Sequence, residues 1–289
     1  LIWASIVQLI SYSFFLFFIS PYSFKIKIYK KEMGELLSKG IGFSMADFFN
    51  YFARNGDYII IGKFLGPEWL GLYSRAYTLM NVVDKMLGQI INKVMFSAFS
   101  EIQNNKDEVI RVLNRSIGLL FCILIPISSF CYLYADEIIT ILLGPGWNDA
   151  IFAYKILVIG MTFRVGYKLL ATCIKGIGGV YQNVLNQFIY MLLVILGSYL
   201  VKESGISGVA FAVLFALCIH FLIQTIYLNN KGYLKFKYIF IKIASSLPLA
   251  LLIVFISLML DNFILVNFNP INSFFIFILI TLFICLFLI

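Results

Sequence analysis

The amino-acid sequence predicts an all-α protein, a bundle of helices that crosses a membrane several times. Of its 289 residues, 62% are hydrophobic and only 12% are charged, whereas a soluble domain carries about 45–50% apolar and about 25% charged residues. The mean hydropathy is +0.96, and the apolar residues form long blocks instead of an amphipathic pattern. Such a chain has more apolar surface than a water-soluble fold could bury, so a soluble globular protein is excluded.

Nine segments are long and apolar enough to be membrane-spanning helices, since a bilayer core of roughly 30 Å needs about 20 apolar residues. Turn sequences mark the breaks between them, for example Gly66-Pro67, Gly144-Pro145-Gly146 and Asn269-Pro270. The expected spans are residues 1–20, 43–65, 77–99, 116–134, 151–173, 182–201, 206–228, 243–261 and 272–289.

The first span, residues 1–20, lacks the basic start and the cleavage site of a signal peptide, so it is expected to stay in the protein. Residues 21–42 form the longest connection and contain the sequence KKEMGELLSK, which indicates a short interfacial helix that leads into the next span. Spans 77–99 and 151–173 are the least hydrophobic. The five cysteines are scattered through apolar segments and show no CxxC spacing, which argues against a disulfide framework and a metal cluster.

Basic residues orient these spans, because short loops rich in Lys and Arg stay in the cytoplasm. Thirteen cations follow the first, third, fifth and seventh spans, whereas the other side has only Arg75 and Lys202. The thirteen are Lys25, Lys27, Lys30, Lys31, Lys39, Lys106, Arg111, Arg115, Lys175, Lys231, Lys235, Lys237 and Lys242. The net charge of +8 therefore reflects topology and requires no nucleic-acid partner. The sequence starts without Met and stops inside an apolar run, so we expect it to be a later portion of a longer protein. The charge pattern makes the first span run from outside to inside, so a full-length chain with a cytoplasmic N-terminus would have an odd number of spans upstream.

Charged residues within the spans are the most informative, because each costs at least about 2.5 kcal/mol near the bilayer centre. In the spans over residues 43–65 and 77–99, polar side chains recur at helical spacing and give each helix a hydrophilic face. Arg54 and Asp57 could instead neutralise each other against a neighbouring helix, one turn apart. We predict a hydrophilic cavity whose cations are Arg54, Lys85, Arg164 and Lys168, offset by Asp47, Asp57 and Asp84.

A mostly positive cavity suits an anionic, hydroxyl-rich substrate, because Arg and Lys bind phosphate well. Asp47 and Asp84 are candidates for a coupling proton or sodium ion. His220 is isolated from other ligand-type residues and is interpreted as a packed or lipid-facing residue, with a proton relay as the alternative. No catalytic constellation, metal cluster or cofactor motif is recognisable, so we do not expect an enzyme or a bound cofactor.

One stretch, residues 54–80 with the sequence RNGDYIIIGKFLGPEWLGLYSRAYTLM, strongly resembles the signature of bacterial polysaccharide flippases of the Wzx type. The outer-loop sequence LLGPGWNDA at residues 142–150 is similar to the corresponding loop of that family. FSAFSEIQ at residues 96–103 looks like the family's helix end, although Ser97 or Ala98 stands where Pro is common. These flippases belong to the multidrug/oligosaccharidyl-lipid/polysaccharide exporter superfamily.

The resemblance implies a fourteen-helix fold of two six-helix lobes with two additional helices, of which this chain covers the sixth helix onward. Five missing helices agree with the odd number derived from charge. The implied parts are the last helix of the N-terminal lobe at 1–20, a cytoplasmic linker with an interfacial helix at 21–42, a C-terminal lobe at 43–228 and two additional helices at 229–289.

The function implied by the resemblance is flipping of polyprenyl-pyrophosphate-linked oligosaccharides across the bacterial cytoplasmic membrane, for O-antigen, capsule or exopolysaccharide. Arg54, Lys85 and Arg164 are then the first candidates for substrate contact, followed by Lys168 and Asp57. Membrane lipids and other polysaccharide assembly proteins are the expected partners. A drug or cation exporter of the same superfamily should have a mainly acidic cavity, and a polymerase or glycosyltransferase should have a large extramembrane loop; a scaffolding protein would not need charged stripes.

Overall fold

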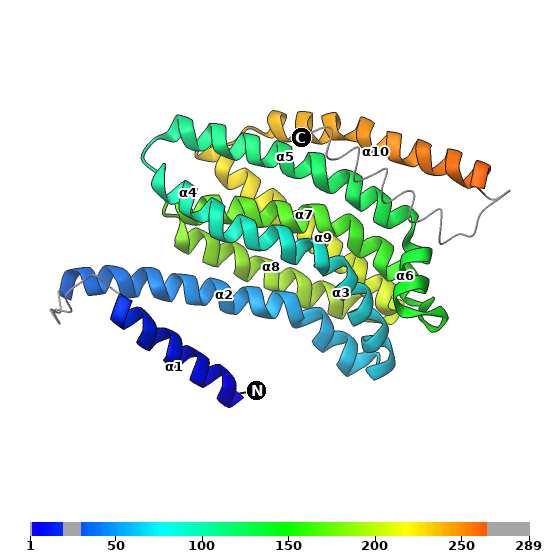
Figure 1. Ribbon diagram of the computed structural model, residues 1–289, viewed down its shortest axis with the longest axis horizontal. Helices are drawn as coiled ribbons and strands as arrows, with labels where there is room; N and C mark the ends of the chain where they lie inside the picture. The colour runs from blue at the N-terminus through cyan, green and yellow to red at the C-terminus, as the bar shows by residue number, and fades with distance from the viewer. Residues whose placement is uncertain (1, 20–29, 265–289) are drawn as a thin grey trace. The chain divides into compact units, whose positions relative to one another are not determined.

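The computed structural model describes residues 2–19 and 30–264, which lie in helices and in the short connections between them, without a strand. The predicted all-α fold is confirmed for this part of the chain, while the expected span at 272–289 lies outside the described residues (Figure 1). The α-helices are α1 (Ile2–Ile19), α2 (Lys30–Phe64), α3 (Pro67–Ile90), α4 (Phe96–Glu101), α5 (Lys106–Leu133), α6 (Ala135–Leu143), α7 (Ala150–Gly176), α8 (Val180–Leu200), α9 (Gly205–Asn230) and α10 (Phe236–Ile264). A π-helical turn (Ile91–Met95) joins α3 to α4, and the 3₁₀ turns Pro145–Trp147 and Lys202–Ser204 precede α7 and α9.

The chain forms two compact units, Leu1–Gly40 and Ile41–Ile289. The smaller unit contains α1 and the start of α2, and the larger unit contains the rest of α2 and the helices that follow. All candidate site residues belong to the larger unit.

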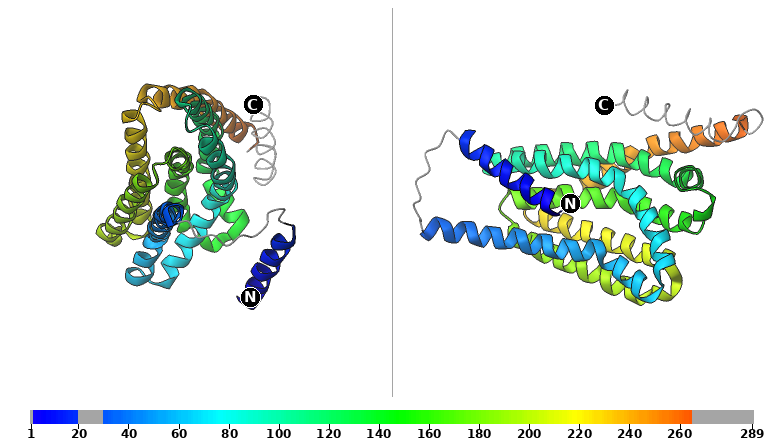
Figure 2. Two further views of the ribbon diagram at one scale, coloured as in Figure 1. Left: turned by 90° about the vertical axis from the view of Figure 1, so that its left-hand side faces the viewer. Right: turned by 60° about the horizontal axis from the view of Figure 1, so that its bottom comes forward.

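Helix α7 is the centre of the larger unit. It packs against α3, α4, α5 and α9, and Figure 2 shows it in the middle of the bundle when the molecule is viewed end-on. Small residues allow this close packing, as is common between membrane helices. A Cβ added to Gly176 would lie 2.6 Å from the Phe99 Cβ, and one added to Gly166 would lie 3.0 Å from the Phe221 ring.

Two further helix pairs surround α7. From residue 41 onward α2 packs on α8, where the rings of Phe49 and Phe188 lie 5.1 Å apart and a Cβ on Gly56 would lie 2.7 Å from Ile195. Helices α5 and α10 lie side by side along the opposite edge of the bundle (Figures 1 and 2). The α5–α10 pair thus forms a separate outer face.

Several helices begin earlier than hydropathy predicts. Helix α3 begins at Pro67, ten residues before the expected span, because Gly66 has a φ of 100° and proline is favourable in a first helical turn. Helix α5 begins at Lys106, where the Asn105 side chain accepts a hydrogen bond from the Glu108 amide at 3.3 Å. Lys106, Arg111 and Arg115, which we expected in a loop, therefore lie on a helix.

Helix α2 is continuous over Lys30–Phe64, so the separate interfacial helix expected at residues 30–39 has no break after it. Glycines at 34, 40 and 42 lower helix propensity but do not end a helix without a proline or a capping sequence.

Four described segments are long and apolar enough to cross a membrane: Lys106–Leu133, Ala150–Gly176, Val180–Leu200 and Lys202–Asn230. They correspond to the expected spans at 116–134, 151–173, 182–201 and 206–228. The helical segments at 43–65 and 77–99 are less apolar because they carry the charged residues considered below.

Candidate functional site

The seven predicted site residues fall into two layers of the larger unit. Asp57, Asp84 and Arg164 are buried. Asp47 and Lys85 are exposed, and Arg54 and Lys168 are half-buried. The structure therefore separates a buried charged layer between α2, α3 and α7 from a set of charges at the surface of α2 and α3.

A salt bridge between α7 and α3 is the strongest polar contact of the buried layer. The Lys168 Nζ donates to both carboxylate oxygens of Asp84 at 2.7 Å. The Asp84 side chain is fully buried, whereas that of Lys168 is 14% exposed. A Cβ on Gly88 would lie 3.2 Å from the Lys168 Nζ, so the glycine leaves room for the ammonium group. Asp84, a candidate for ion coupling, is thus already paired.

Arg164 lies one turn before Lys168 on α7 and is enclosed in the bundle. Its guanidinium carbon lies 4.8 Å from the centre of the Tyr77 ring on α3, a cation–π contact that contributes about 2 kcal/mol when desolvated. None of its three guanidinium nitrogens has a hydrogen-bond partner among the described residues. The neighbouring helices cover Arg164 completely, and its assignment to the substrate cavity stays a prediction.

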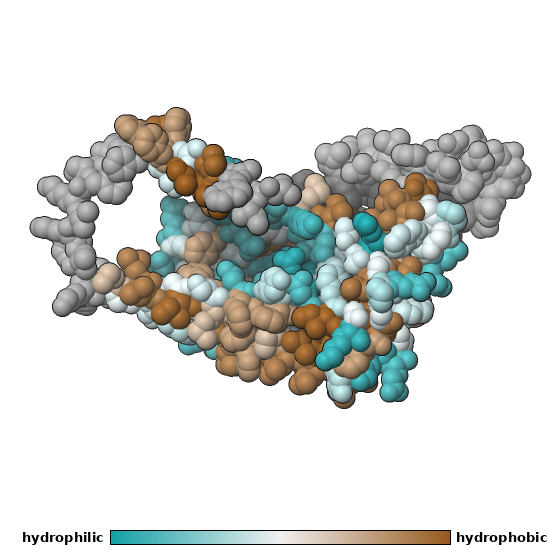
Figure 3. Space-filling model, turned by 90° about the horizontal axis from the view of Figure 1, so that it is seen from below, coloured by the Kyte–Doolittle hydropathy of each residue, from teal (hydrophilic) through white to brown (hydrophobic). Residues whose placement is uncertain are grey.

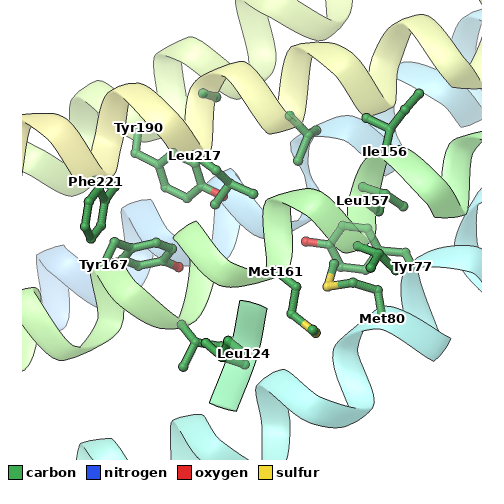
Figure 4. Close-up of a cluster of buried hydrophobic side chains, with 14 of the residues drawn as sticks. Tyr77, Met80, Leu124, Ile156, Leu157, Met161, Tyr167, Tyr190, Leu217 and Phe221 are labelled. Atoms are coloured by element: carbon green, nitrogen blue, oxygen red, sulfur yellow. The ribbon is translucent and has the colours of Figure 1, made fainter. Parts of the chain in front are cut away.

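Tyrosines and His220 extend this buried polar layer toward α8 and α9. The His220 ring lies 4.6 Å from the rings of both Tyr167 and Tyr190 and stacks on the latter. Figure 4 shows Tyr77 on one side and Tyr167 and Tyr190 on the other, with their hydroxyl groups directed toward the space between them. His220 is fully buried, so it is packed inside the bundle and does not face lipid.

The tyrosine hydroxyls were missed as site groups because tyrosine in a membrane helix is usually interpreted as an interface residue. A signal was present in the sequence: Tyr167 stands three positions after Arg164 and therefore lies on the same side of α7. The hydroxyls of Tyr167 and Tyr190 have no hydrogen-bond partner among the described residues. The layer therefore has several polar atoms in excess of its internal contacts.

Asp57 does not pair with Arg54. Its carboxylate instead accepts hydrogen bonds from the Tyr73 hydroxyl at 2.8 Å and from the Tyr58 amide at 2.9 Å. Within residues 2–19 and 30–264, the ion pairs are Lys168–Asp84 and Lys155–Asp136. The alternative in which Arg54 and Asp57 neutralise each other is therefore not the arrangement observed.

The surface charges lie on polar helix faces. Thr78, Lys85, Gln89 and Asn92 are all exposed, and their spacing of seven, four and three places them on one side of the helix. Figure 3 shows hydrophilic surface gathered in a hollow of the molecule, next to a broad apolar surface. Lys85 has no ion-pair partner among the described residues, and neither does Arg54.

The part of the chain that the structure describes contains no group of three His, Cys, Asp or Glu residues that could hold a metal ion. The chemistry available at the site is therefore that of ammonium, guanidinium, carboxylate, amide and hydroxyl groups. Groups of these kinds are suited to binding and orienting charged ligands.

Comparison with known proteins identifies the family. A family model described as "Polysaccharide biosynthesis protein" matches residues 1–152, which include α3 and the polar residues on it. The chain belongs to this polysaccharide biosynthesis protein family. The resemblance to Wzx-type flippases, noted in the sequence of residues 54–80, is thereby confirmed.

Three curated relatives carry related names. The chain is 23% identical over 163 residues to the lipopolysaccharide biosynthesis protein WzxC of Escherichia coli, which covers 55% of the chain and 33% of WzxC. It is 30% identical over 118 residues to the teichuronic acid biosynthesis protein TuaB of Bacillus subtilis, covering 40% of the chain and 24% of TuaB. It is 26% identical over 199 residues to the probable low-salt glycan biosynthesis flippase Agl15 of Haloferax volcanii, covering 65% of this chain and 40% of Agl15. The chain thus spans less than half the length of these relatives.

Solved structures define the fold. The lipid II flippase MurJ in an inward closed conformation matches with a TM-score of 0.67 at 16% identity, over 93% of this chain and 56% of MurJ. An outward-facing multidrug transporter of the MATE family matches with a TM-score of 0.60 at 18% identity, over 78% of this chain and 54% of the transporter. The protein is a multi-pass membrane protein with the fold of the multidrug/oligosaccharidyl-lipid/polysaccharide exporter superfamily.

Proposed function

We propose that this chain is part of a flippase that moves polyprenyl-pyrophosphate-linked oligosaccharides across the bacterial cytoplasmic membrane for surface polysaccharide synthesis. One observation carries this proposal: Arg54 and Lys85 lie on polar faces of α2 and α3 and have no ion-pair partner among the described residues. The chain that holds them belongs to a family of polysaccharide biosynthesis proteins. The names of WzxC and Agl15 support the same function.

Moving an anionic headgroup across the membrane requires cations such as these. A pyrophosphate-sugar headgroup cannot enter hydrocarbon unaided, because burying an unpaired anion is very costly. A guanidinium group can bind phosphate through two parallel hydrogen bonds, and an ammonium group acts as a compact point charge. In our proposal Arg54 and Lys85 contact the pyrophosphate, while the prenyl tail remains in the lipid.

The buried residues have a different part in this proposal. Lys168 is neutralised by Asp84, and Arg164 lies beneath the Tyr77 ring, so these cations hold α3 against α7 and position its polar face. Asp57 anchors Tyr73 in the same way. Asp47 is exposed and is the remaining candidate for proton or sodium coupling, whereas Asp84 would first have to release Lys168.

Transport in this proposal is alternating access, in which two lobes rock around a site near the middle of the membrane. Residues 43–228 would form one lobe, residues 1–20 the last helix of the other, and residues 229–289 two additional helices. The chain moves its substrate without chemical change, so the proposed protein is a transporter and not an enzyme.

Neutralising the two surface cations in the complete gene product tests this function. Arg54→Ala and Lys85→Ala should each lower flipping of a fluorescent polyprenyl-pyrophosphate oligosaccharide in proteoliposomes by about 10- to 100-fold, since a hydrogen bond to a charged group contributes about 1.5–3 kcal/mol. Lys85→Arg should retain most activity. Arg75→Ala, which removes an exposed cation from the first turns of α3, is the matched control and should behave as the wild type.

Membrane levels of each variant are measured in parallel, so that failed insertion is recognised. Wild-type flipping by both neutralised variants would refute the assigned roles. Export of cationic drugs by the wild-type protein, without flipping of the oligosaccharide, would instead favour a MATE-type exporter with the same fold.

A further inference from the structure

A basic pocket lies between α5 and α10, on the outer face that these two helices form. It has a volume of about 570 Å³. Three cations line it: Arg111 and Arg115 from α5, and Lys242 from α10. Asn114 and Tyr238 complete its polar wall. None of the proposed transport residues belongs to this pocket.

The pocket is held in shape by contacts between its two helices. The Tyr238 hydroxyl donates to the Asn114 carbonyl oxygen at 3.4 Å. The Lys242 side chain passes over Gly118, where a Cβ would lie 3.3 Å from its Cδ and Cε atoms, and its Nζ lies 5.3 Å from the centre of the Tyr238 ring. The glycine thus leaves the space that brings the third cation beside the two arginines.

None of these three cations forms an ion pair within the described structure. The ion pairs found there, Lys168–Asp84 and Lys155–Asp136, include none of the three. The carboxylate of Glu108, on the first turn of α5, is hydrogen-bonded to a different group: it accepts from the side-chain amide nitrogen of Asn105 at 3.2 Å. In addition, the Asn114 side-chain oxygen is buried without a hydrogen-bond partner among the described residues. The pocket therefore calls for a ligand that supplies negative charge and also a donor group.

The position of the pocket along the bundle matches a lipid headgroup. Helices α5 and α10 both begin at this end, where the Lys106 Nζ donates to the Lys231 carbonyl oxygen at 2.8 Å and ties the start of α5 to the end of α9. Lys235 and Lys237 lie at the start of α10 at the same end. The excess of cations predicts that this end faces the cytoplasm, and basic pockets between helices on that side bind anionic headgroups.

A second, apolar pocket lies further along the same two helices. It has a volume of about 480 Å³ and is lined by residues of α5, α7 and α10, including Ile125, Phe163, Ile243 and Leu247. The basic pocket therefore lies nearer the first turns of α5 and α10, and the apolar pocket lies along their later turns. This order, charge first and hydrocarbon next, is that of a phospholipid in the leaflet.

We propose that the pocket between α5 and α10 binds the phosphate headgroup of an anionic glycerophospholipid, whose acyl chain lies toward the apolar pocket. Arg111, Arg115 and Lys242 bind the phosphate oxygens, and a headgroup hydroxyl donates to the Asn114 side chain. This site is separate from the proposed transport cavity, so it does not depend on what the protein transports.

Binding of phosphatidylglycerol to the purified full-length protein tests the proposal. Native mass spectrometry in detergent gives the affinity for phosphatidylglycerol, with phosphatidylcholine as the uncharged comparison. The double variant Arg111→Gln/Arg115→Gln should weaken phosphatidylglycerol binding by about 30-fold, at about 1 kcal/mol for each cation. Lys235→Gln/Lys237→Gln removes the same charge from the same end outside the pocket and should change the affinity less than threefold.

Each alternative ligand predicts a different result in these binding measurements. Equal losses in the two double variants, or equal binding of both phospholipids by the wild type, would overturn the proposal in favour of general surface electrostatics. Displacement of phosphatidylglycerol by millimolar inorganic phosphate would identify a soluble anion site, and displacement by equimolar polyprenyl phosphate would assign the pocket to the transported lipid. Either result would overturn the phospholipid assignment.

Discussion

Removal of the Asp84 carboxylate isolates the contribution of the salt bridge between α3 and α7. Asp84→Asn keeps the shape of the side chain but leaves the Lys168 ammonium group, 14% exposed, without the carboxylate to which it donates two 2.7 Å hydrogen bonds. Breaking a buried pair in this way costs about 3–5 kcal/mol. The unfolding equilibrium should therefore shift by about two hundred- to several thousand-fold.

The double variant Asp84→Asn/Lys168→Met removes both charges and should recover most of this loss, because the uncompensated charge is then absent. Reversible unfolding of the purified full-length protein by SDS in mixed micelles measures all four corners of the double-mutant cycle.

The Lys155–Asp136 pair provides a matched control on the same helix. Its atoms are equally close, at 2.6 Å, but its side chains are 26% and 56% exposed, so Asp136→Asn should cost no more than about 1 kcal/mol. The reasoning is refuted if Asp84→Asn costs no more than Asp136→Asn, or if the Asp84 and Lys168 substitutions are simply additive.

Two further substitutions test the packing around the site in the same unfolding assay. Tyr73→Phe removes the hydroxyl donor of the fully buried Asp57 carboxylate and should destabilise the protein by about 1–3 kcal/mol, unless Asp57→Asn is introduced as well. Gly176→Ala places a Cβ 2.6 Å from Phe99 and should cost about 1–3 kcal/mol, whereas Gly146→Ala, with no atom within 4 Å of its Cβ, should be neutral. Equal stability of the two alanine variants would contradict the packing argument.

The class of fold was predictable because the length of apolar segments is fixed by the bilayer, and four of the expected spans coincide with helices that could cross it. Helix starts were less accurate. Pro67 and Asn105 are recognisable start signals, yet a hydropathy criterion places the boundary where the apolar run begins, several residues later.

The orientation of individual charges was the least predictable part. Asp84 and Lys85 are neighbours in sequence, but about 100° of helix rotation places the first against α7 and the second at the surface. Periodicity identifies a polar face without telling which edge of it meets another helix. Arg164 illustrates the same difficulty, because its burial depends on Tyr77, far away in the sequence.

The π-helical turn Ile91–Met95 changes which side of the helix faces α7 between α3 and α4. An extra residue in a single turn delays the rotation of everything after it by about 100°. Phe99 is thereby brought against Gly176 of α7, at a place that would fall to Ala98 in an uninterrupted α-helix. The turn changes which side of the helix faces α7: Lys85 and Gln89 are exposed before it, and the buried Phe99 contacts α7 after it.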